Sequence, residues 1–480
     1  MRVTAVIFAL LMTGCVVGPN YRRPPIPSPS TYTRPNVSGA TVSTDVPGGE
    51  AQQLAYGKDI PHDWWTLFQS QPLNVLVEQS LRANPTIPAA EQALRQALEL
   101  VAAQRGLFYP AIQGSSLASY QKQSATLAPN LNSNELRYSL FTHQINVGYT
   151  PDVFGGNRRQ VESLKAQAEN QRFQLEAAHL ALTSNVVAAA VQEASLRAQI
   201  AASREILSIS SKSLEVIRRQ FQFGAVSGLE VAAQETALAQ LEQTLPPLQK
   251  QEEQNRDLLI ALAGRLPADD LDQTFDLAAF HLPEDVPLSI PSKLVEQRPD
   301  VRAAESLLQA ASAQIGVAAA NRLPQFSITA PLGGTSTNIV KTFADSNPFW
   351  FAIGEVSGTI FDAGTLRRRQ RAAEAAYAQA AAQYRSTVIT AFQNVADALY
   401  ALQSDAESLK AAVAAERAAR RTLDITLKQQ EFGAVNYLAL LSAQQAYQQA
   451  LVARVQAQAN RLSDTAALFQ ALGGGWWNRP

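Results

Sequence analysis

The sequence has few residues of the kinds that bind metals, form disulfides or carry out catalysis. In 480 residues there are one cysteine, two methionines and four histidines. A single cysteine excludes an internal disulfide framework and a cysteine-rich metal site. Both methionines lie within the first 12 residues, which argues against a methionine-lined copper path. The histidines are dispersed, and neither a Gly-x-Ser-x-Gly elbow nor a phosphate-binding loop is present, so we expect no enzyme and no metal site.

The charge has no excess of either sign. The 40 basic and 41 acidic residues leave a net charge of −1, which provides no field for holding nucleic acid. Hydrophobic residues make up 46% of the chain, so there is ample material for a core and a wholly disordered chain is excluded.

Proline and glycine are missing from two long stretches. Nine of the 25 prolines lie before residue 73, whereas residues 152–245 and 349–479 have none. Residues 157–223 and 365–432 contain neither proline nor glycine. These runs of 67 and 68 residues far exceed the roughly 11–12 residues of an average globular helix. We therefore predict two very long helices, each about 100 Å if unbroken.

The N-terminus predicts an exported chain. Arg2 is followed by a short apolar run and small residues, the pattern of a signal peptide over residues 1–14. Met12-Thr13-Gly14-Cys15 resembles a bacterial lipobox, which would place a covalent lipid on Cys15 and no other cofactor; the alternative is an ordinary residue of a discarded signal. No later segment reaches about 18 uninterrupted apolar residues, so a membrane crossing would need strands.

The chain is duplicated. Three residues recur 214 positions later, namely Pro85, Glu91 and Pro110 as Pro299, Glu305 and Pro324. Phe223–Ser227 and Phe432–Asn436 are related by an offset of 209. Chance does not give such a colinear series, so we predict two copies of one structural unit, over residues 85–264 and 299–473.

Each copy predicts the same succession of elements. A proline at a first helical turn begins a short helix, over 85–109 in the first copy. Residues 110–151 and 324–362 alternate apolar and polar side chains and have room for one β-hairpin each, either in a membrane or packed on the helices of a soluble protein. A long helix and a shorter return helix follow. From their lengths, we expect the short and return helices to stack end to end.

The second long run contains a coiled-coil seam. Apolar residues recur at alternating spacings of three and four from Phe392 to Val413, and again at Leu423 and Leu427. Glu416 and Arg420 occupy the seam positions in the gap, in the order that favours an ion pair along one helix face.

Four strands are too few for a closed membrane barrel, which needs about eight. We therefore expect two or three chains to combine, with the helices forming a second cylinder below the strands. Residues 15–84 would supply the anchor, a proline-rich strap over 19–47 and the start of an equatorial region. The connector 265–298 would complete that region, and 474–480 would form a tail.

Together these features resemble the outer-membrane efflux lipoproteins of the TolC/OprM family, in their NodT-like branch. The resemblance rests on the opening Cys15–Pro24, on Trp64–Phe68 with Pro72-Leu73, and on the duplicated helix starts and Phe-Gly-Ala-Val turns. It implies an α+β membrane protein, a homotrimer whose β-barrel, four strands per chain, continues into a long α-helical barrel through the periplasm. The implied function is the exit duct of a tripartite pump, conducting small molecules such as drugs. Its implied partners are a periplasmic adaptor and an inner-membrane transporter of the resistance–nodulation–division (RND) type.

In that family the adaptor docks at the periplasmic tip, where long helix turns into return helix. The matching turns here are Gly224–Ser227 and Gly433–Asn436. A turn without docking is the alternative, because glycine also ends helices for conformational reasons. Arg218 and Arg219, one helical turn earlier, are either adaptor contacts or part of a solvated face.

Family members often close the tip with aspartates or salt bridges. Val435 stands where some members carry the aspartate, which puts an acidic gate in doubt and favours closure by apolar packing. Asp424 is the nearest aspartate on the second long helix, and is either a surface residue or a gate residue.

Other charged and aromatic residues stand where strand gives way to long helix. Asp152 and Asp362 are predicted helix caps. The arginines that follow form either an inward ring or a solvated surface, and the aromatics near residue 350 either an interfacial girdle or loop packing. These sets are Arg158, Arg159 and Arg367–Arg369, and Phe349, Trp350 and Phe351.

Two other functions fit the same fold pattern. One is a duct for type I protein secretion, although the opening motif favours small-molecule efflux. The other is a periplasmic coiled-coil scaffold without a pore. The substrate is not predicted, because in such systems the inner-membrane pump makes most of the selection.

Overall fold

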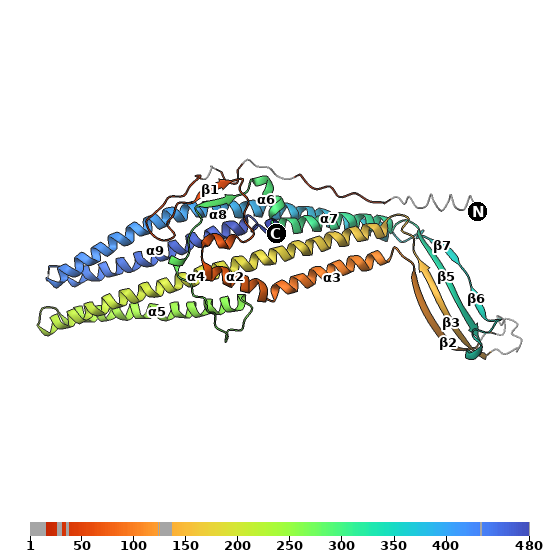
Figure 1. The fold of residues 1–480 in the computed structure, drawn as a ribbon, viewed down its shortest axis with the longest axis horizontal. Coiled ribbons are helices and arrows are strands. Elements are labelled where there is room, and N and C mark those ends of the chain that lie inside the picture. The colour runs from red at the N-terminus through yellow and green to blue at the C-terminus, as the bar shows by residue number, and fades with distance from the viewer. Residues whose placement is uncertain are drawn as a thin grey trace. The chain divides into compact units, whose positions relative to one another are not determined.

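The computed structural model describes residues 16–25, 31–34, 38–122, 124, 137–432 and 434–479. The predicted signal peptide, Cys15 and Gly433 lie outside these residues. The chain divides into two compact units. The first takes its described residues from Met1–Pro24, Ala93–Gln171 and Ala303–Tyr384, and the second from Pro25–Gln92, Arg172–Arg302 and Arg385–Pro480. The protein is mostly helical, with a smaller proportion of sheet (Figure 1).

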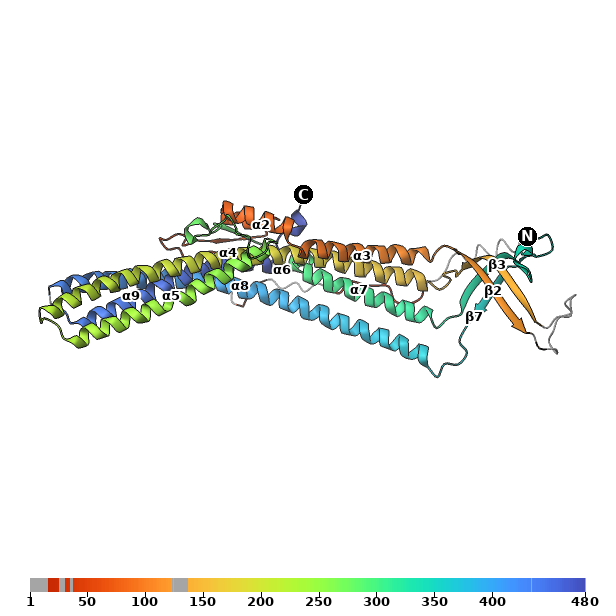
Figure 2. The same ribbon diagram turned by 90° about the horizontal axis from the view of Figure 1, so that it is seen from below.

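Two helices of equal length dominate the chain. Both α4 (Gly156–Gln222) and α8 (Thr365–Glu431) have 67 residues. They coincide with the stretches that lack proline and glycine, since nothing there breaks the backbone hydrogen-bond ladder. The return helices α5 (Gly228–Leu262) and α9 (Tyr437–Ala471) have 35 residues each (Figure 2). The other helices are η1 (Trp64–Phe68), α2 (Gln71–Ala83), α3 (Thr86–Gly106), η2 (Leu277–Ala279), α6 (Pro291–Gln297), α7 (Pro299–Ala320), η3 (Ile339–Lys341) and η4 (Trp476–Asn478).

The first unit contains an antiparallel sheet. Its order is β2-β3-β5, and β6 and β7 both pair with the other side of β5. The β2–β3 hairpin lies within residues 110–151, and β5, β6 and β7 lie within 324–362. The strand bounds are Ala111–Lys122 for β2, Arg137–Tyr149 for β3, Gln325–Ser336 for β5, Pro348–Trp350 for β6 and Ile353–Ser357 for β7.

The fourth strand is interrupted, although its residues alternate as predicted. Strands β6 and β7 pair with β5 in one common register, so they are two parts of a single line. At the gap, the Phe351 N–H donates to the Pro331 carbonyl oxygen at 3.3 Å. Pro331 has no N–H with which to return the bond. The interruption therefore lies opposite a residue of the partner strand that cannot donate a backbone hydrogen bond.

In the second unit, residues 50–84 and 265–298 meet at a two-stranded parallel sheet. Strand β1 (Gln53–Tyr56) pairs there with β4 (Asp285–Leu288). Nearby, the buried rings of Trp64 and Phe68 lie 5.5 and 6.4 Å from that of Phe469 on α9. Burial of three large rings ties η1 to a return helix.

Short and return helices stack end to end in both repeats. The Asn84 side chain, just before α3, donates to the Leu262 carbonyl oxygen at the end of α5, at 2.9 Å. Arg298, just before α7, donates to the Ala471 carbonyl oxygen at the end of α9, at 2.8 Å. The donors are related by the offset of 214 and the acceptors by 209. Each pair supplies a partner for a carbonyl that the helix end leaves free, so the predicted stacking is confirmed.

The predicted seam is buried. Val395, Leu399, Leu402, Ala406, Leu409, Val413 and Leu423 are each at most 2% exposed. Leu423 joins an apolar cluster with side chains of α4 and α9, including Ile206 and Leu440. The ion pair predicted between Glu416 and Arg420 does not form, because each side chain has a partner on another helix: Arg454 on α9 at 3.6 Å and Glu205 on α4 at 3.2 Å. Within the described residues, no helix has a stretch apolar enough to span a bilayer.

The end of α5 offers a test of this packing. Gly264 has a φ of 74°, and a β-carbon there would lie 2.5 Å from the Ala83 carbonyl oxygen. Gly57 has a φ of 82° with no atom within 4 Å of that position, so it is a control for backbone strain alone. Alanine at either site incurs about 1–2 kcal/mol of left-handed strain. We expect Gly264→Ala to lower the thermal unfolding midpoint, measured by circular dichroism, by at least about twice as much as Gly57→Ala; equal shifts would contradict the packing.

Candidate functional site

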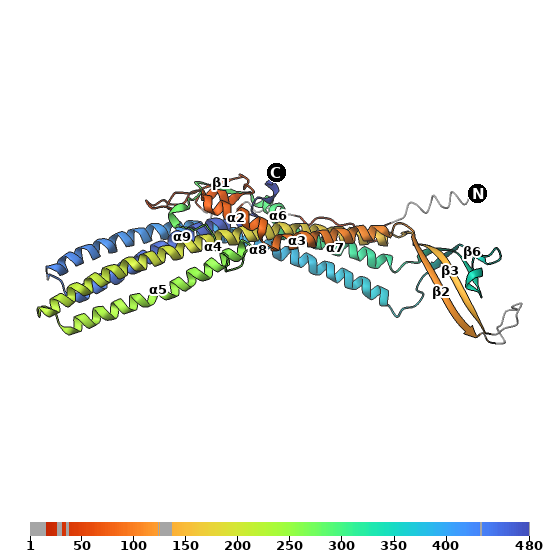
Figure 3. The same ribbon diagram turned by 60° about the horizontal axis from the view of Figure 1, so that its bottom comes forward.

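The two turns between long and return helices lie at one end of the second unit (Figure 3). In the first turn, Gly224 has a φ of 71°, and Ser227 and Glu230 form a capping box at the start of α5. In the second, the Asn436 side chain accepts a hydrogen bond from the Ala439 N–H at 3.0 Å. Ser227 and Asn436 are therefore helix caps, whatever else they bind.

Large apolar side chains are exposed around both turns. Phe223 and Phe432 are 87% and 86% exposed, and Leu229 and Leu438 are 79% and 66% exposed. Each residue has a counterpart in the other repeat at the offset of 209. A duplicated apolar surface is typical of a place where another protein binds.

The other residues predicted for the tip have distinct surroundings. Arg218 forms an ion pair with Glu235 of α5 at 2.7 Å, whereas Arg219 is exposed. Val435 is half-buried in the turn that joins α8 to α9, and Asp424 is exposed on α8. The arginines are thus not equivalent, since one of them joins the long helix to its return helix.

Buried polar side chains join the two helical hairpins behind these turns. Tyr437 of α9 donates to Gln234 of α5 at 2.8 Å, and Gln234 donates to the Ser210 hydroxyl of α4 at 2.8 Å. Farther along, Gln444 of α9 donates to Ser213 of α4 at 2.9 Å. Sequence reasoning missed this set, because isolated Gln, Ser and Tyr residues carry no pattern that names their partners.

A second polar set surrounds Arg420. Its guanidinium donates to the Tyr447 hydroxyl at 2.8 Å and to Glu205 at 3.2 Å, and Tyr447 also donates to Glu205 at 3.2 Å. Three helices, α4, α8 and α9, meet in this triangle. Each set contains bonds that cross from one hairpin to the other, beside bonds within a hairpin.

A carboxyl pair links α8 to α9 beneath the proline-rich strap. Burial, together with a hydrogen bond to Asp464 and the charge of that residue, raises the pKa of Asp405 to about 7, against the opposing charge of Arg461. Arg461 is fully buried and donates to Thr41 and to the Gly48 carbonyl oxygen, both at 3.1 Å. One buried cation therefore holds the strap on the helices beside the carboxyl pair.

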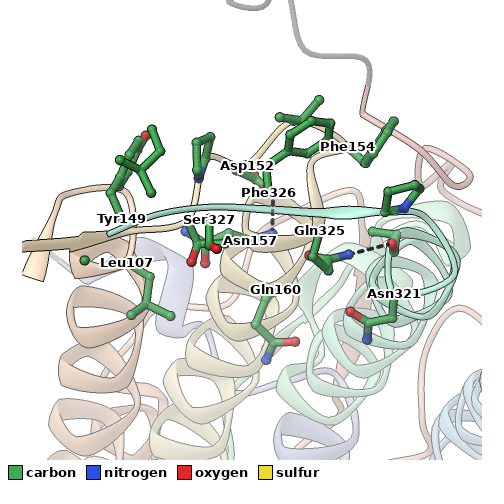
Figure 4. A pocket seen from close by; sticks show the side chains of 18 of the residues that line it. Leu107, Tyr149, Asp152, Phe154, Asn157, Gln160, Asn321, Gln325, Phe326 and Ser327 are labelled. Atoms are coloured by element: carbon green, nitrogen blue, oxygen red, sulfur yellow. Dashed lines mark hydrogen bonds between the residues drawn. The ribbon is translucent and has the colours of Figure 1, made fainter. Parts of the chain in front are cut away.

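The first unit has a pocket of about 600 Å³ where strands meet helices (Figure 4). Amides and aromatic rings line much of it, and Asp152 is the charged member among its described lining residues. Asp152 accepts hydrogen bonds from the N–H groups of Asn157 and Arg158 at 2.9 and 2.8 Å. Asp362 likewise accepts from the Leu366 N–H at 2.7 Å, which lowers its pKa. Both aspartates cap the long helices as predicted.

The same junction holds the chain that follows Cys15. The Val17 N–H donates to the Phe154 carbonyl oxygen at 3.2 Å. Arg159, 4% exposed, donates to the carbonyl oxygens of Val17 and Gly18, both at 3.1 Å. The two predicted alternatives for Arg159, an inward ring or a solvated surface, were therefore both wrong, since it anchors the N-terminal segment. Arg23 adds an ion pair with Glu305 of α7 at 2.9 Å.

Comparison with known proteins agrees with this arrangement. The sequence profile described as outer membrane efflux protein matches residues 76–265 and 290–474. The chain belongs to the outer membrane efflux protein family. The matched ranges cover both repeats, and the family places this efflux protein in the outer membrane, with transport as its role.

Similar proteins match this efflux protein along nearly their whole length. The toluene efflux pump outer membrane protein TtgC of Pseudomonas putida is 28% identical, over 98% of this chain and 95% of its own. The outer membrane protein OprJ of Pseudomonas aeruginosa is also 28% identical, over 99% and 96%. The solved outer-membrane channel OprN aligns with a TM-score of 0.83 at 27% identity, over 96% of this chain and all of its own.

The carboxyl pair makes the stability of this efflux protein depend on pH. Because the pKa of Asp405 is higher in the folded protein than in the unfolded chain, the folded state binds its proton more tightly. The free energy of unfolding should then fall as pH rises from about 4 to about 7, and stay level above that. Asp405→Asn should flatten this slope in pH-dependent denaturant titrations. Asp397→Asn, which removes an exposed carboxylate of the same helix, should leave it; a slope unchanged in Asp405→Asn would contradict the assignment.

Proposed function

We propose that this protein is the exit duct of a tripartite efflux pump, and that three copies form it. The observation that carries the proposal is the open sheet of the first unit. Its edge strands, β2 on one side and β6 and β7 on the other, have no outer partner within the described part of the chain. Exposed edges invite pairing with further strands, so neighbouring copies would satisfy them.

The exposed side chains of the sheet support insertion into a membrane. On β2, Ile112, Leu117 and Tyr120 are 73%, 58% and 75% exposed, and Trp350 of β6 is 76% exposed. Apolar and aromatic side chains on strands suit lipid contact and its interfaces. Three chains with four strand lines each would give a twelve-stranded barrel, and the long helices would then line a periplasmic conduit.

The N-terminal segment supports a lipid anchor on Cys15, with no other cofactor. Val17 is held at the junction of strands and helices by Arg159 and Phe154, and Arg23 pairs with Glu305 farther along α7. A lipid on Cys15 would therefore emerge beside the strands, at the membrane surface that the barrel implies.

We propose that the apolar tip binds a periplasmic adaptor, which connects the duct to an RND-type inner-membrane transporter. Phe223, Leu229, Phe432 and Leu438 would supply apolar contacts, with Gly224, Gly433 and Arg219 beside them. TtgC is named for a toluene pump and is similar over its whole length. We therefore propose small organic molecules as the cargo class, moved passively through the duct.

We propose that the tip closes by packing at Val435 and by the polar latch behind it. Val435 is half-buried in the turn that joins α8 to α9, whereas Asp424 is exposed on α8. The bonds from Tyr437 to Gln234 and from Gln444 to Ser213 hold the hairpin of α8 and α9 against that of α4 and α5. Opening would require these buried bonds to break together.

The duct is tested by conductance and by phenotype. The purified protein should form channels in planar bilayers and should remain trimeric in detergent. A scaffold without a pore would give no channels. A deletion strain should become sensitive to small toxic compounds while still secreting large proteins. Loss of protein secretion with unchanged sensitivity would instead identify a type I secretion duct.

The latch is tested by side-chain removal. Gln234→Ala removes the bond from Tyr437, the one bond of that side chain that crosses between the hairpins, so at about 1 kcal/mol the open probability should rise about fivefold in bilayer recordings. Gln243→Ala, at an exposed position of the same helix, is the control and should leave gating unchanged. Val435→Asp and Val435→Ala should also change gating; unchanged gating in both would remove Val435 from the closure.

A further inference from the structure

The two strand-to-helix junctions share a backbone plan but differ in charge. The first residues of α4 and α8, Gly156 and Thr365, are related by the offset of 209. With this offset, Arg158 and Arg159 correspond to Arg367 and Arg368. Two of the three positions that follow gain a basic residue in the second copy: Gln160 and Glu162 correspond to Arg369 and Arg371.

At the first junction every positive charge has a negative partner. Arg158 pairs with Asp152 at 3.2 Å and Arg159 with Glu162 at 2.7 Å. The two arginines and two carboxylates sum to zero. This junction is electrically complete within the chain.

At the second junction the positive charges are left over. Asp362 uses both carboxylate oxygens to accept from the N–H groups of Gly364 and Leu366. The side chains of Arg367, Arg368, Arg369 and Arg371 are exposed and have no hydrogen-bond or ion-pair partner among the described residues. Four arginines against one aspartate leave a net charge of +3.

A fifth cation lies beside this group on another helix. Arg322, just past the end of α7, donates to Gln370 at 2.6 Å and is itself exposed. Gln370 in turn donates to Glu374, at 2.9 Å. The basic surface therefore includes residues from both sides of the strand segment and is not a property of one helix end.

This arrangement is unfavourable for the isolated chain. Arginines in the first turns of α8 lie near the positive end of the helix dipole and repel one another. Helical residues step by about 100°, so Arg367 and Arg371 share a face while Arg369 points elsewhere. An anionic partner that reaches more than one face of the helix would offset both the repulsion by the helix dipole and the repulsion among the arginines.

The flanking residues indicate what that partner is. Ile360 and Phe361, immediately before the basic group, are 101% and 86% exposed. Apolar side chains beside a cluster of cations are typical of a surface that meets the headgroup layer of a membrane. Arginine binds phosphate oxygens with two parallel donors, which suits phospholipid headgroups.

We propose that Arg322, Arg367, Arg368, Arg369 and Arg371 form a basic collar that binds the anionic phospholipid headgroups of the inner leaflet of the outer membrane. The proposal rests on the proposed function, because only a membrane-inserted sheet brings this junction to the periplasmic face of the bilayer. The collar would fix how deeply the second repeat sits in the membrane. The proposed lipid on Cys15, held near the strands through the Arg159 contacts, would do the same for the first repeat.

The test compares lipid retention by full-length variants. Protein would be reconstituted in nanodiscs of phosphatidylcholine with one-fifth phosphatidylglycerol as the probe, extracted, and analysed by native mass spectrometry for retained lipid. The collar variant is R367Q/R368Q/R369Q/R371Q. A control with the same change of charge, R204Q/K212Q/R385Q/R421Q, removes four exposed cations of the second unit. Single-channel recordings of every protein show whether the duct itself has formed.

Wild type and control should retain phosphatidylglycerol over phosphatidylcholine, and the collar variant should lose at least about tenfold of that preference. The corresponding fourfold Arg→Lys variant should recover most of it, because the charge is kept. Equal retention by wild type and the collar variant overturns the proposal. A second outcome also overturns the proposal: the collar variant keeps its lipid preference but dissociates into monomers. That result would show that the arginines bind a neighbouring copy of the chain. If the wild-type protein forms no channels, the proposed duct function fails. If it forms channels but the collar variant keeps its lipid preference, only the collar proposal fails.

Discussion

The structure depends on the burial of one face along the 67-residue α4 and along α8 from Tyr384 onward. A helix of this length is not stable in water on its propensity alone, since most helical stability in proteins comes from packing. The seam from Val395 to Leu423 on α8 supplies that packing against α4 and α9, and the return helices and strap follow from it. The absence of proline and glycine keeps the seam unbroken, and alanine between the larger residues lets neighbouring helices approach.

Polar groups interrupt the seam only where they have partners on other helices. Glu416 and Arg420 reach Arg454 and Glu205, and the Asp405 carboxyl shares its surroundings with Asp464 and Arg461. A buried polar group is costly unless it is hydrogen-bonded, so such contacts specify which helix lies next to which. These contacts add to the apolar seam and specify the order of the helices around it.

Duplication has preserved the backbone and changed the side chains. The caps Ser227 and Asn436, and the donors Asn84 and Arg298, perform the same task with different chemistry. Charges are less constrained: the first junction binds the N-terminal segment through Arg159, while the corresponding Arg368 is exposed. Backbone hydrogen bonds must be satisfied in both copies, whereas an exposed charge is free to acquire a separate partner.

The sequence by itself determined the repeat, the lengths of the long helices, the seam and the alternation of the strands. The repeat follows from matching residues at fixed offsets, and the helix lengths follow from runs without proline or glycine. The seam and the alternation follow from about 3.6 residues per helical turn or two per strand repeat. Only the tertiary structure decided the partners of Glu416 and Arg420, the break opposite Pro331 and the burial of Arg159 and Arg461. Those outcomes join residues far apart in the chain, and a local pattern carries no information on which distant group will meet a given side chain.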